Sequence, residues 1–343
     1  MSDQRDGGIA WTDQTWNPTR GCSRVSKGCE HCYAENVARR FSGPGQPYEG
    51  LVRLDRDGNA KAQWNGVVRL IPDHLGDPLR WKRQRRVFVN SMSDLFHETL
   101  AFERIASVFG VMAAAPQHTF QVLTKRPENA RAFFEWAAKR RGERWREATG
   151  DWPTDACLDW ARNGCPMLPN VWLGVSVEDQ ATADERIPIL LDTPAWTRWV
   201  SAEPLLGPVD MHGYLDGLVA GADISRPNVD WLVVGGESGP QARLMHPDWV
   251  RSLRGQCVES AVPFLFKQWG EWFPASFLPK DTLLPARRWG WISENGGPAE
   301  ISDFGPFKDE FAHHELMGRV GKKLAGRRLD NLVHDDYPAE VPF

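Results

Sequence analysis

The chain lacks any long apolar stretch. None of its 343 residues belongs to a run of the roughly 18 apolar residues that a membrane-spanning helix requires, so we expect no transmembrane helix and no membrane partner. The polar residues 1–8 also lack the apolar centre of a signal peptide. We therefore expect a cytoplasmic protein, in a compartment where thiols remain reduced.

The chain also lacks an excess of basic residues. Its 41 Lys and Arg are outnumbered by 45 Asp and Glu, which gives a net charge of −4. This balance provides no overall attraction to nucleic acid. Basic residues are nevertheless concentrated in three runs, at residues 80–86, 139–141 and 322–328. Each run is typical of either a phosphate-contacting patch or a solvated helix face.

The six cysteines are not needed to hold the fold. A chain of this length buries roughly three quarters of its unfolded surface and does not depend on disulfides. In a reducing compartment, clustered cysteines indicate a metal or catalytic site instead. Cys157, Cys165 and Cys257 match no metal-binding spacing known to us, and we expect them to be free buried thiols.

Short apolar runs alternate with helix-like stretches along the chain. The apolar runs are rich in Val, Trp and Phe, as in parallel strands covered on both faces, and lie at residues 9–16, 86–90, 119–123, 171–175, 198–201, 230–234 and 263–267. Helices are predicted at residues 32–40, 98–114, 127–139, 180–191 and 247–260. This alternation predicts the α/β class, as a partial (β/α) barrel of six or seven parallel strands.

Polar or small residues follow most of these runs. The carboxyl ends of strands in such folds form the usual ligand-binding edge. We therefore predict a cofactor-binding edge made of Ser91, Ser93, Asp94, Ser176, Glu178, Glu203, Gly235, Gly236, Glu237 and Lys267. The glutamates could transfer protons or bind polar groups, or could form ion pairs with Lys125, Arg126 and Lys267. Ser93 or Asp94 could equally cap the helix predicted after them.

Two stretches interrupt the alternation. Residues 43–77 are rich in Gly, Pro and turn signals, which predict an insertion that carries a hairpin. Residues 141–169 indicate a second insertion, and the alternation ends at Trp272. We therefore predict a barrel domain at residues 1–272 and a C-terminal appendage or tail at residues 273–343.

Three cysteines form the strongest motif. Cys22, Cys29 and Cys32 have the spacing C-x6-C-x2-C, between a predicted strand and a predicted helix. Thiolates select iron–sulfur clusters or zinc. Three ligands leave one iron of a cubane cluster open, whereas a structural zinc ion normally has four. We predict a cluster, with zinc or unligated thiols as the alternatives; His31 or His97 could supply a fourth zinc ligand.

Motifs along the predicted barrel resemble those of a known family. They are WTDQTWNP from Trp11, CYA from Cys32, FVNSMSDLFH from Phe88, LTKRP from Leu123, WLGVSVE from Trp172, SAEP from Ser201, GGES from Gly235 and KQWGEW from Lys267. With residues 321–327, they resemble a bacteriophage-associated three-Cys-motif protein family of unknown function. Three cysteines after the first strand also resemble the radical S-adenosylmethionine (SAM) superfamily, of which that family looks like a divergent branch.

The resemblance implies an enzyme in which Cys22, Cys29 and Cys32 hold a [4Fe-4S] cluster and SAM binds the fourth iron. Reductive cleavage of SAM would give a 5′-deoxyadenosyl radical that abstracts hydrogen from a substrate, with a flavodoxin- or ferredoxin-like electron donor. The phage association, the basic runs and 17 tryptophans favour a nucleic-acid base or nucleotide as substrate. The alternatives are a nucleic-acid-interacting protein with structural zinc and an iron–sulfur enzyme without SAM.

Two features differ from the radical SAM pattern. The usual spacing is C-x3-C-x2-C, whereas the first gap here is six residues. The usual Gly-Gly-Glu motif follows the second strand and binds the amino group of SAM, whereas Gly235, Gly236 and Glu237 follow the sixth predicted strand. A longer loop can still gather three thiolates, so the expected cluster ligands are unchanged, whereas Gly235, Gly236 and Glu237 do not occupy the usual place of the SAM-binding motif.

Overall fold

The structure is a computed structural model that describes residues 8–53, 63–139, 167–215, 227–278, 285–296, 298–299 and 313–339. Nearly all of the predicted insertion at residues 141–169, with Cys157 and Cys165, lies outside the described residues. No helix in the described ranges is long and apolar enough to cross a bilayer.

Seven strands form a parallel sheet, as the sequence predicts. In sheet order they are β1 (Gln14–Trp16), β6 (Arg86–Val89), β7 (Thr119–Thr124), β8 (Val171–Val177), β9 (Thr197–Ala202), β10 (Trp231–Gly235) and β11 (Phe264–Gln268). Every residue of β8 and of β10 is buried, which explains their continuous apolar sequences. Helices lie between successive strands, so the prediction of a partial (β/α) barrel is confirmed.

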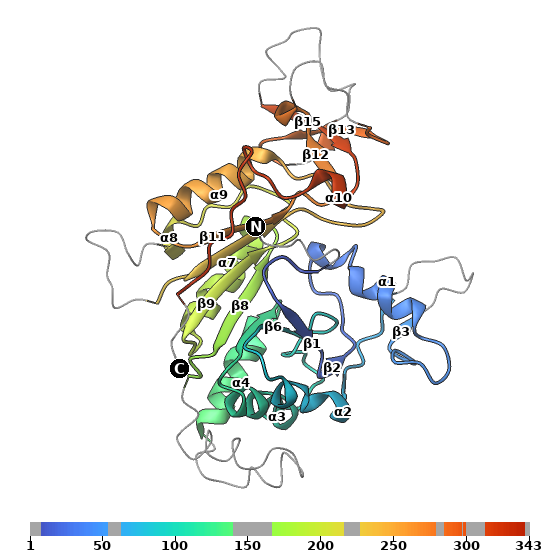
Figure 1. Cartoon of the computed structure of the whole chain (residues 1–343), viewed down its shortest axis with the longest axis vertical. Helices are drawn as coiled ribbons and strands as arrows, with labels where there is room; N and C mark the ends of the chain where they lie inside the picture. The colour runs from blue at the N-terminus through green and yellow to red at the C-terminus, as the bar shows by residue number, and fades with distance from the viewer. Residues whose placement is uncertain are drawn as a thin grey trace. The chain divides into compact units, whose positions relative to one another are not determined.

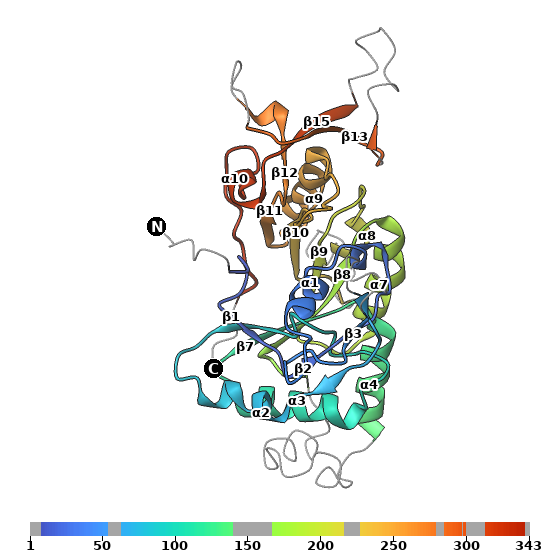
Figure 2. The ribbon, with the colours of Figure 1, turned by 90° about the vertical axis from the view of Figure 1, so that its right-hand side faces the viewer.

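The longer helices are α1 (Tyr33–Arg40), α3 (Phe102–Ala114), α4 (Pro127–Lys139), α7 (Gln180–Asp192) and α9 (Pro247–Glu259), and single turns form α2 (Pro72–Leu75), α8 (His212–Leu215) and α10 (Lys322–Ala325). Helices α3 and α4 lie side by side (Figures 1 and 2), and the ring centroids of Phe109 and Phe133 are 5.1 Å apart. Helix α3 begins four residues later than predicted. The preceding residues form a turn instead, in which Asp94 Oδ1 accepts from Phe96 N and His97 Nδ1 accepts from Thr99 N.

The chain divides into two compact units. Unit 1 contains Met1–Val175, Pro188–Arg198 and Ala339–Phe343, and unit 2 contains Ser176–Ile187 and Trp199–Pro338. The boundary falls within strands β8 and β9.

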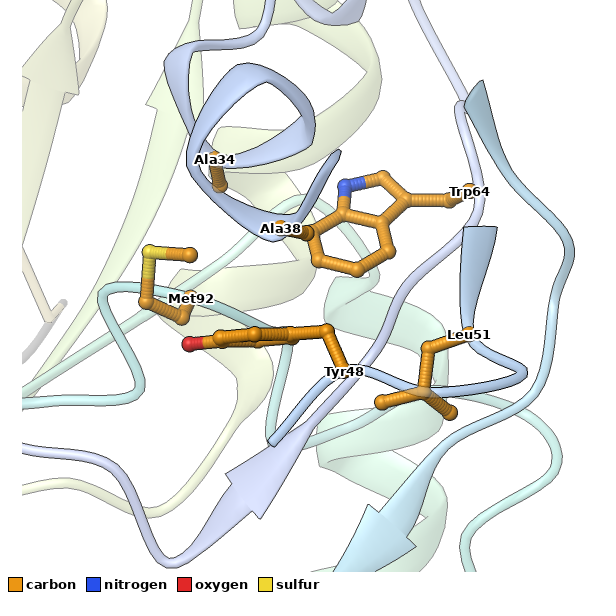
Figure 3. Close-up of a cluster of buried hydrophobic side chains, with 6 residues drawn as sticks. All are labelled: Ala34, Ala38, Tyr48, Leu51, Trp64 and Met92. Carbon is orange, nitrogen blue, oxygen red and sulfur yellow. The ribbon is translucent and has the colours of Figure 1, made fainter. Parts of the chain in front are cut away.

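Unit 1 holds the predicted insertion at residues 43–77. Strand β3 (Val52–Arg53) pairs antiparallel with β4 (Gln63–Trp64), and β5 (Arg69–Leu70) pairs antiparallel with β2 (Thr19–Arg20). These pairings enclose a small apolar core, in which the Tyr48 ring lies between Met92 and Leu51 (Figure 3). Cys22 and Cys32 pack against this core, so the insertion supports the cysteine loop.

Unit 2 holds the residues after Trp272. Strands β12 (Trp272–Pro274), β15 (His314–Arg319), β13 (Trp289–Ser293) and β14 (Pro298–Ala299) form an antiparallel sheet in that order, and β13 and β15 run side by side in Figure 2. The chain after β15 lies along β11. Trp269 N donates to Gly326 O at 3.1 Å, and Phe266 N donates to His334 O at 3.1 Å. This segment therefore covers the edge of β11.

Candidate functional site

The three cysteines lie in one loop of unit 1, directly after β2. Gly21, at the start of the loop, bridges to Ser93 and has φ +97, and a Cβ there would lie 2.0 Å from the Val67 carbonyl oxygen. Only glycine fits this position without a backbone shift. A short 3-10 turn (Lys27–Cys29) follows, and Cys32 is the N-cap residue of α1. The loop therefore leads from the carboxyl end of the first strands to the first helix.

All three thiols are half-buried and interact electrostatically. Burial raises the pKa of Cys22 to about 12, and Asp94 raises it further against the opposing charge of Arg126. Cys29 and Cys32 also raise the pKa of Cys22, so the three thiols lie close enough to interact. Burial likewise raises the pKa of Cys32, although the backbone N–H groups of Glu35 and Ala34 oppose this. In the described ranges, no group of three or more His, Cys, Asp or Glu side chains is placed so that it could hold a metal ion.

Two guanidinium groups flank the loop. Arg24 donates to the carboxylate of Glu35 through Nε at 3.0 Å and Nη2 at 2.5 Å. Arg126 donates through Nη1 to Cys22 Sγ at 3.9 Å and through Nη2 to the Ser23 carbonyl at 3.0 Å. Soft thiol donors beside cations suit an anionic, thiolate-bound group such as an iron–sulfur cluster.

His97 is poorly placed as a fourth ligand. Its Nε2 lies 2.8 Å from Ser23 Oγ and its Nδ1 lies 3.0 Å from Thr99 Oγ1, so both ring nitrogens already have partners. Burial and the charge of Arg126 lower the pKa of His97, which favours the neutral ring.

The predicted cofactor-binding residues of unit 1 bind other parts of the protein. Ser91 Oγ donates to Asn17 Oδ1 at 3.1 Å, and Ser93 Oγ donates to the Thr19 carbonyl at 3.0 Å. Asp94 accepts hydrogen bonds from Phe96 N, Thr124 Oγ1, Lys125 N and Arg126 Nη1. These contacts fasten the ends of β1, β6 and β7 together. Ser93 and Asp94 therefore have structural roles, but neither caps the helix as the sequence suggested, because α3 begins at Phe102 with Ala101 as its N-cap residue.

The remaining predicted residues belong to unit 2, where three of them meet. Glu203 Oε1 lies 2.9 Å from Lys267 Nζ, and a Cβ on Gly235 would lie 2.5 Å from the same oxygen. Ser201 Oγ also donates to Glu203 Oε2 at 3.1 Å. Glu203 and Gly235 are at the carboxyl ends of β9 and β10, and Lys267 is near the end of β11. A largely buried carboxylate and ammonium therefore occupy the predicted edge.

The other two strand-end glutamates form ion pairs of their own. Glu178 Oε2 accepts from Arg186 Nη1 at 3.1 Å, and that nitrogen also donates to the Ser176 carbonyl at 2.7 Å. Glu237 accepts from Arg243 through both carboxylate oxygens, at 2.7 and 2.9 Å. The sequence identified the glutamates but not Arg186 and Arg243. Both lie on the same chain segments as their partners, so a search for basic residues six to eight positions downstream would have found them.

The basic run at residues 80–86 lies away from the cysteine loop. Strand β6 begins at Arg86, so this run precedes the amino end of the strand, whereas the loop follows the carboxyl ends. Arg86 pairs with Asp13, and Arg85 donates to Gln14. Within unit 1, a phosphate-contacting surface on this run would therefore be separate from the thiols.

The fold and these side chains define an α/β protein with a partial parallel barrel and a half-buried group of three thiols. The chain belongs to the family described as "Protein of unknown function (DUF5131)", whose model matches residues 6–338. No curated protein and no solved structure matches the chain. The family description names no activity.

Proposed function

We propose that this chain is a radical SAM-like iron–sulfur enzyme. The observation that carries the proposal is the loop of Cys22, Cys29 and Cys32, which follows the first strand of a parallel sheet and gathers three half-buried, interacting thiols. Two arginines beside these thiols suit the negative charge that they would carry as metal ligands. Both ring nitrogens of His97 are engaged, which favours an open, three-thiolate site over a closed zinc site.

Each part of the chain has a role in this proposal. Cys22, Cys29 and Cys32 would hold a [4Fe-4S] cluster, which would supply the electron for the reductive cleavage of SAM. The thiols must lose their protons on ligation. Arg126 and Arg24 would then offset the thiolate charge. The apolar core around Tyr48 and Trp64 keeps water from one side of the loop.

Each unit has its own polar groups that could contact a cofactor or a substrate. In unit 2, Glu203 and Lys267 offer a carboxylate and an ammonium group beside Gly235, whose missing side chain leaves space for the Glu203 carboxylate. Taken by themselves, these groups suit a ligand that carries both an amine and a carboxylate. In unit 1, Ser91, Ser93 and Asp94 act mainly by fixing the strand ends. An electron donor, and a nucleic-acid base or nucleotide as substrate, complete the proposal.

Anaerobic reconstitution tests the cluster. The wild-type protein should bind about four irons per chain, as a cubane requires, and a Cys29→Ala variant should lose the iron while remaining folded. Cys257→Ala is the matched control, because Cys257 is a buried thiol in α9, and this variant should keep its iron. Zinc instead of iron after anaerobic expression would contradict the cluster and support the structural-zinc alternative.

A second measurement tests SAM. Adding SAM to the reduced cluster should change its electron paramagnetic resonance spectrum, and reduction should release 5′-deoxyadenosine. An unchanged spectrum at saturating SAM would reject the radical mechanism and favour an iron–sulfur enzyme without SAM.

A further inference from the structure

Arg126 connects the cysteine loop to the ends of two strands. It precedes α4, and its side chain is only 7% exposed. Its guanidinium donates to acceptors from two segments. In the turn after β6 these are Glu98 Oε2 at 2.7 Å and Asp94 Oδ2 at 3.2 Å. In the cysteine loop they are the Ser23 carbonyl at 3.0 Å, Ser23 Oγ at 2.7 Å and Cys22 Sγ at 3.9 Å. A single buried group thus fixes the first cysteine against the strands.

The position of Arg126 is itself fixed. Its backbone N–H donates to Thr124 Oγ1 at 2.9 Å, and Thr124 Oγ1 donates to Asp94 Oδ1 at 2.7 Å. An arginine side chain is always charged in proteins, and Asp94 Oδ2 at 3.2 Å and Glu98 Oε2 at 2.7 Å supply its counter-charges. A permanent cation that is held on several sides can orient a ligand as well as neutralise it.

We propose that Arg126 is the positioning residue of the thiolate site, which fixes Cys22 and, by a hydrogen bond to its sulfur, makes a group bound there easier to reduce. This inference rests on the proposed iron–sulfur function. Hydrogen bonds to cluster sulfurs and nearby charge are among the factors that set a cluster's reduction potential. Residues that orient metal ligands typically change metal affinity 10–100-fold when they are removed.

Arg24 provides a matched comparison within the same loop. It carries the same charge, but its hydrogen bonds go to Glu35, which also accepts from Trp64 N at 3.1 Å. Arg24 therefore fastens the loop to α1 and to the insertion, and removing its charge tests how much a nearby cation contributes without a hydrogen bond to sulfur.

The experiment compares Arg126→Gln, Arg126→Lys and Arg24→Gln with the wild type, after anaerobic reconstitution. Iron retention against a chelator and the midpoint potential of the cluster are measured on each. Arg126→Gln should retain iron about 10–100-fold less well and should shift the potential to more negative values. Arg126→Lys keeps the charge but not the planar donor geometry, so it should lose retention with a smaller shift. Arg24→Gln should change both properties less than Arg126→Gln.

An unchanged potential in loaded Arg126→Gln, or an equal shift in Arg24→Gln, would overturn the proposal. Thermal unfolding of each apoprotein separates a lost contact from a lost fold, and Arg126→Lys provides the test if the glutamine variant does not fold. If the wild type binds no iron, the proposed function fails. Cobalt(II) titration then tests the positioning role separately. Arg126→Gln should bind cobalt(II) more weakly than the wild type, and equal binding would refute the role.

Discussion

The carbonyl oxygen of Trp269 lies where a side chain on Gly236 would begin, because a Cβ at Gly236 would stand 2.0 Å from that oxygen. The approach is mutual, since a Cβ on Gly270 would lie 2.1 Å from the Glu237 carbonyl oxygen. Gly236 N donates to Gln268 O at 2.9 Å, and Gln268 Nε2 donates back to Gly236 O at 3.2 Å. Glycine at positions 236 and 270 is therefore required for the backbones after β10 and β11 to meet.

Gly236→Ala should consequently destabilise the protein. A methyl group there must displace backbone, which costs at least about 1–3 kcal/mol. Gly255→Ala is the control, because no atom lies within 4 Å of its Cβ position and Gly255 is inside α9. That substitution should stabilise the helix by about 0.5–1 kcal/mol. Urea unfolding of the two variants measures both effects, and a Gly236→Ala variant as stable as the wild type would contradict the close approach.

Asp94 and Glu98 bind the same guanidinium but should differ in importance. Asp94 is 8% exposed and Glu98 is 55% exposed at the side chain. Asp94→Ala leaves buried Arg126 without its buried counter-charge, which should cost about 3–5 kcal/mol. Glu98→Ala removes a solvent-screened partner and should cost no more than about 1 kcal/mol. Denaturant titration of the apoproteins would disprove this ranking if the two losses were equal.

The strands and helices could be predicted because their sequences are strongly patterned. The fully buried strands β8 and β10 give continuous apolar runs that no surface loop would carry. The antiparallel sheet of unit 2 was not predicted. Strands β13 and β15 are only partly buried and are distant in the sequence, so neither gives a continuous apolar run, and their pairing depends on tertiary structure.

The sequence predicted the three candidate ligands of the site but not the residues that hold them in place. The three cysteines share one short motif, whereas Arg126 and Cys22 are 104 residues apart. From the sequence, Arg126 was an expected ion-pair partner of the strand-end glutamates, but in the structure it binds Asp94 and Glu98. The reason is the sheet order, because β6 and β7 are neighbours and their carboxyl ends bring Asp94 and Arg126 together.

The ion pair of Glu178 and Arg186 should respond strongly to a single truncation. The two side chains are 0% and 3% exposed, and their charges are 3.1 Å apart. Glu178→Ala should cost about 3–5 kcal/mol because it leaves a buried guanidinium uncompensated, whereas replacing both residues by Met should recover much of that loss. Glu135→Ala removes the exposed carboxylate of a pair with Arg131 and should cost less than about 1 kcal/mol. Stability that falls further in the double variant than in Glu178→Ala would refute this account.

His246 should make the stability of unit 2 depend on pH. Burial lowers the pKa of His246, and this effect exceeds the opposite effect of the charges of Asp248 and Glu294. The Nδ1 atom of His246 accepts a hydrogen bond from Asp248 N at 3.1 Å, at the start of α9. Above the unfolded pKa of about 6.5, the ring is neutral in both states and the full stability is present. As the pH falls below that value, the unfolded chain takes up the proton first, so stability is lost until the lower folded pKa is passed.

His246→Asn isolates this effect, because Asn keeps an N-cap acceptor but has no proton to bind. At pH 7.5 the variant should be within about 1 kcal/mol of the wild type. Between pH 7.5 and 5.5 the free energy of unfolding should fall less steeply in the variant than in the wild type. The two slopes should differ by up to about 1.4 kcal/mol per pH unit. The stability of the variant should still depend on pH, because His97, His118 and His334 also have lowered pKa values. Identical slopes in the wild type and in His246→Asn would show that His246 is not the group that titrates.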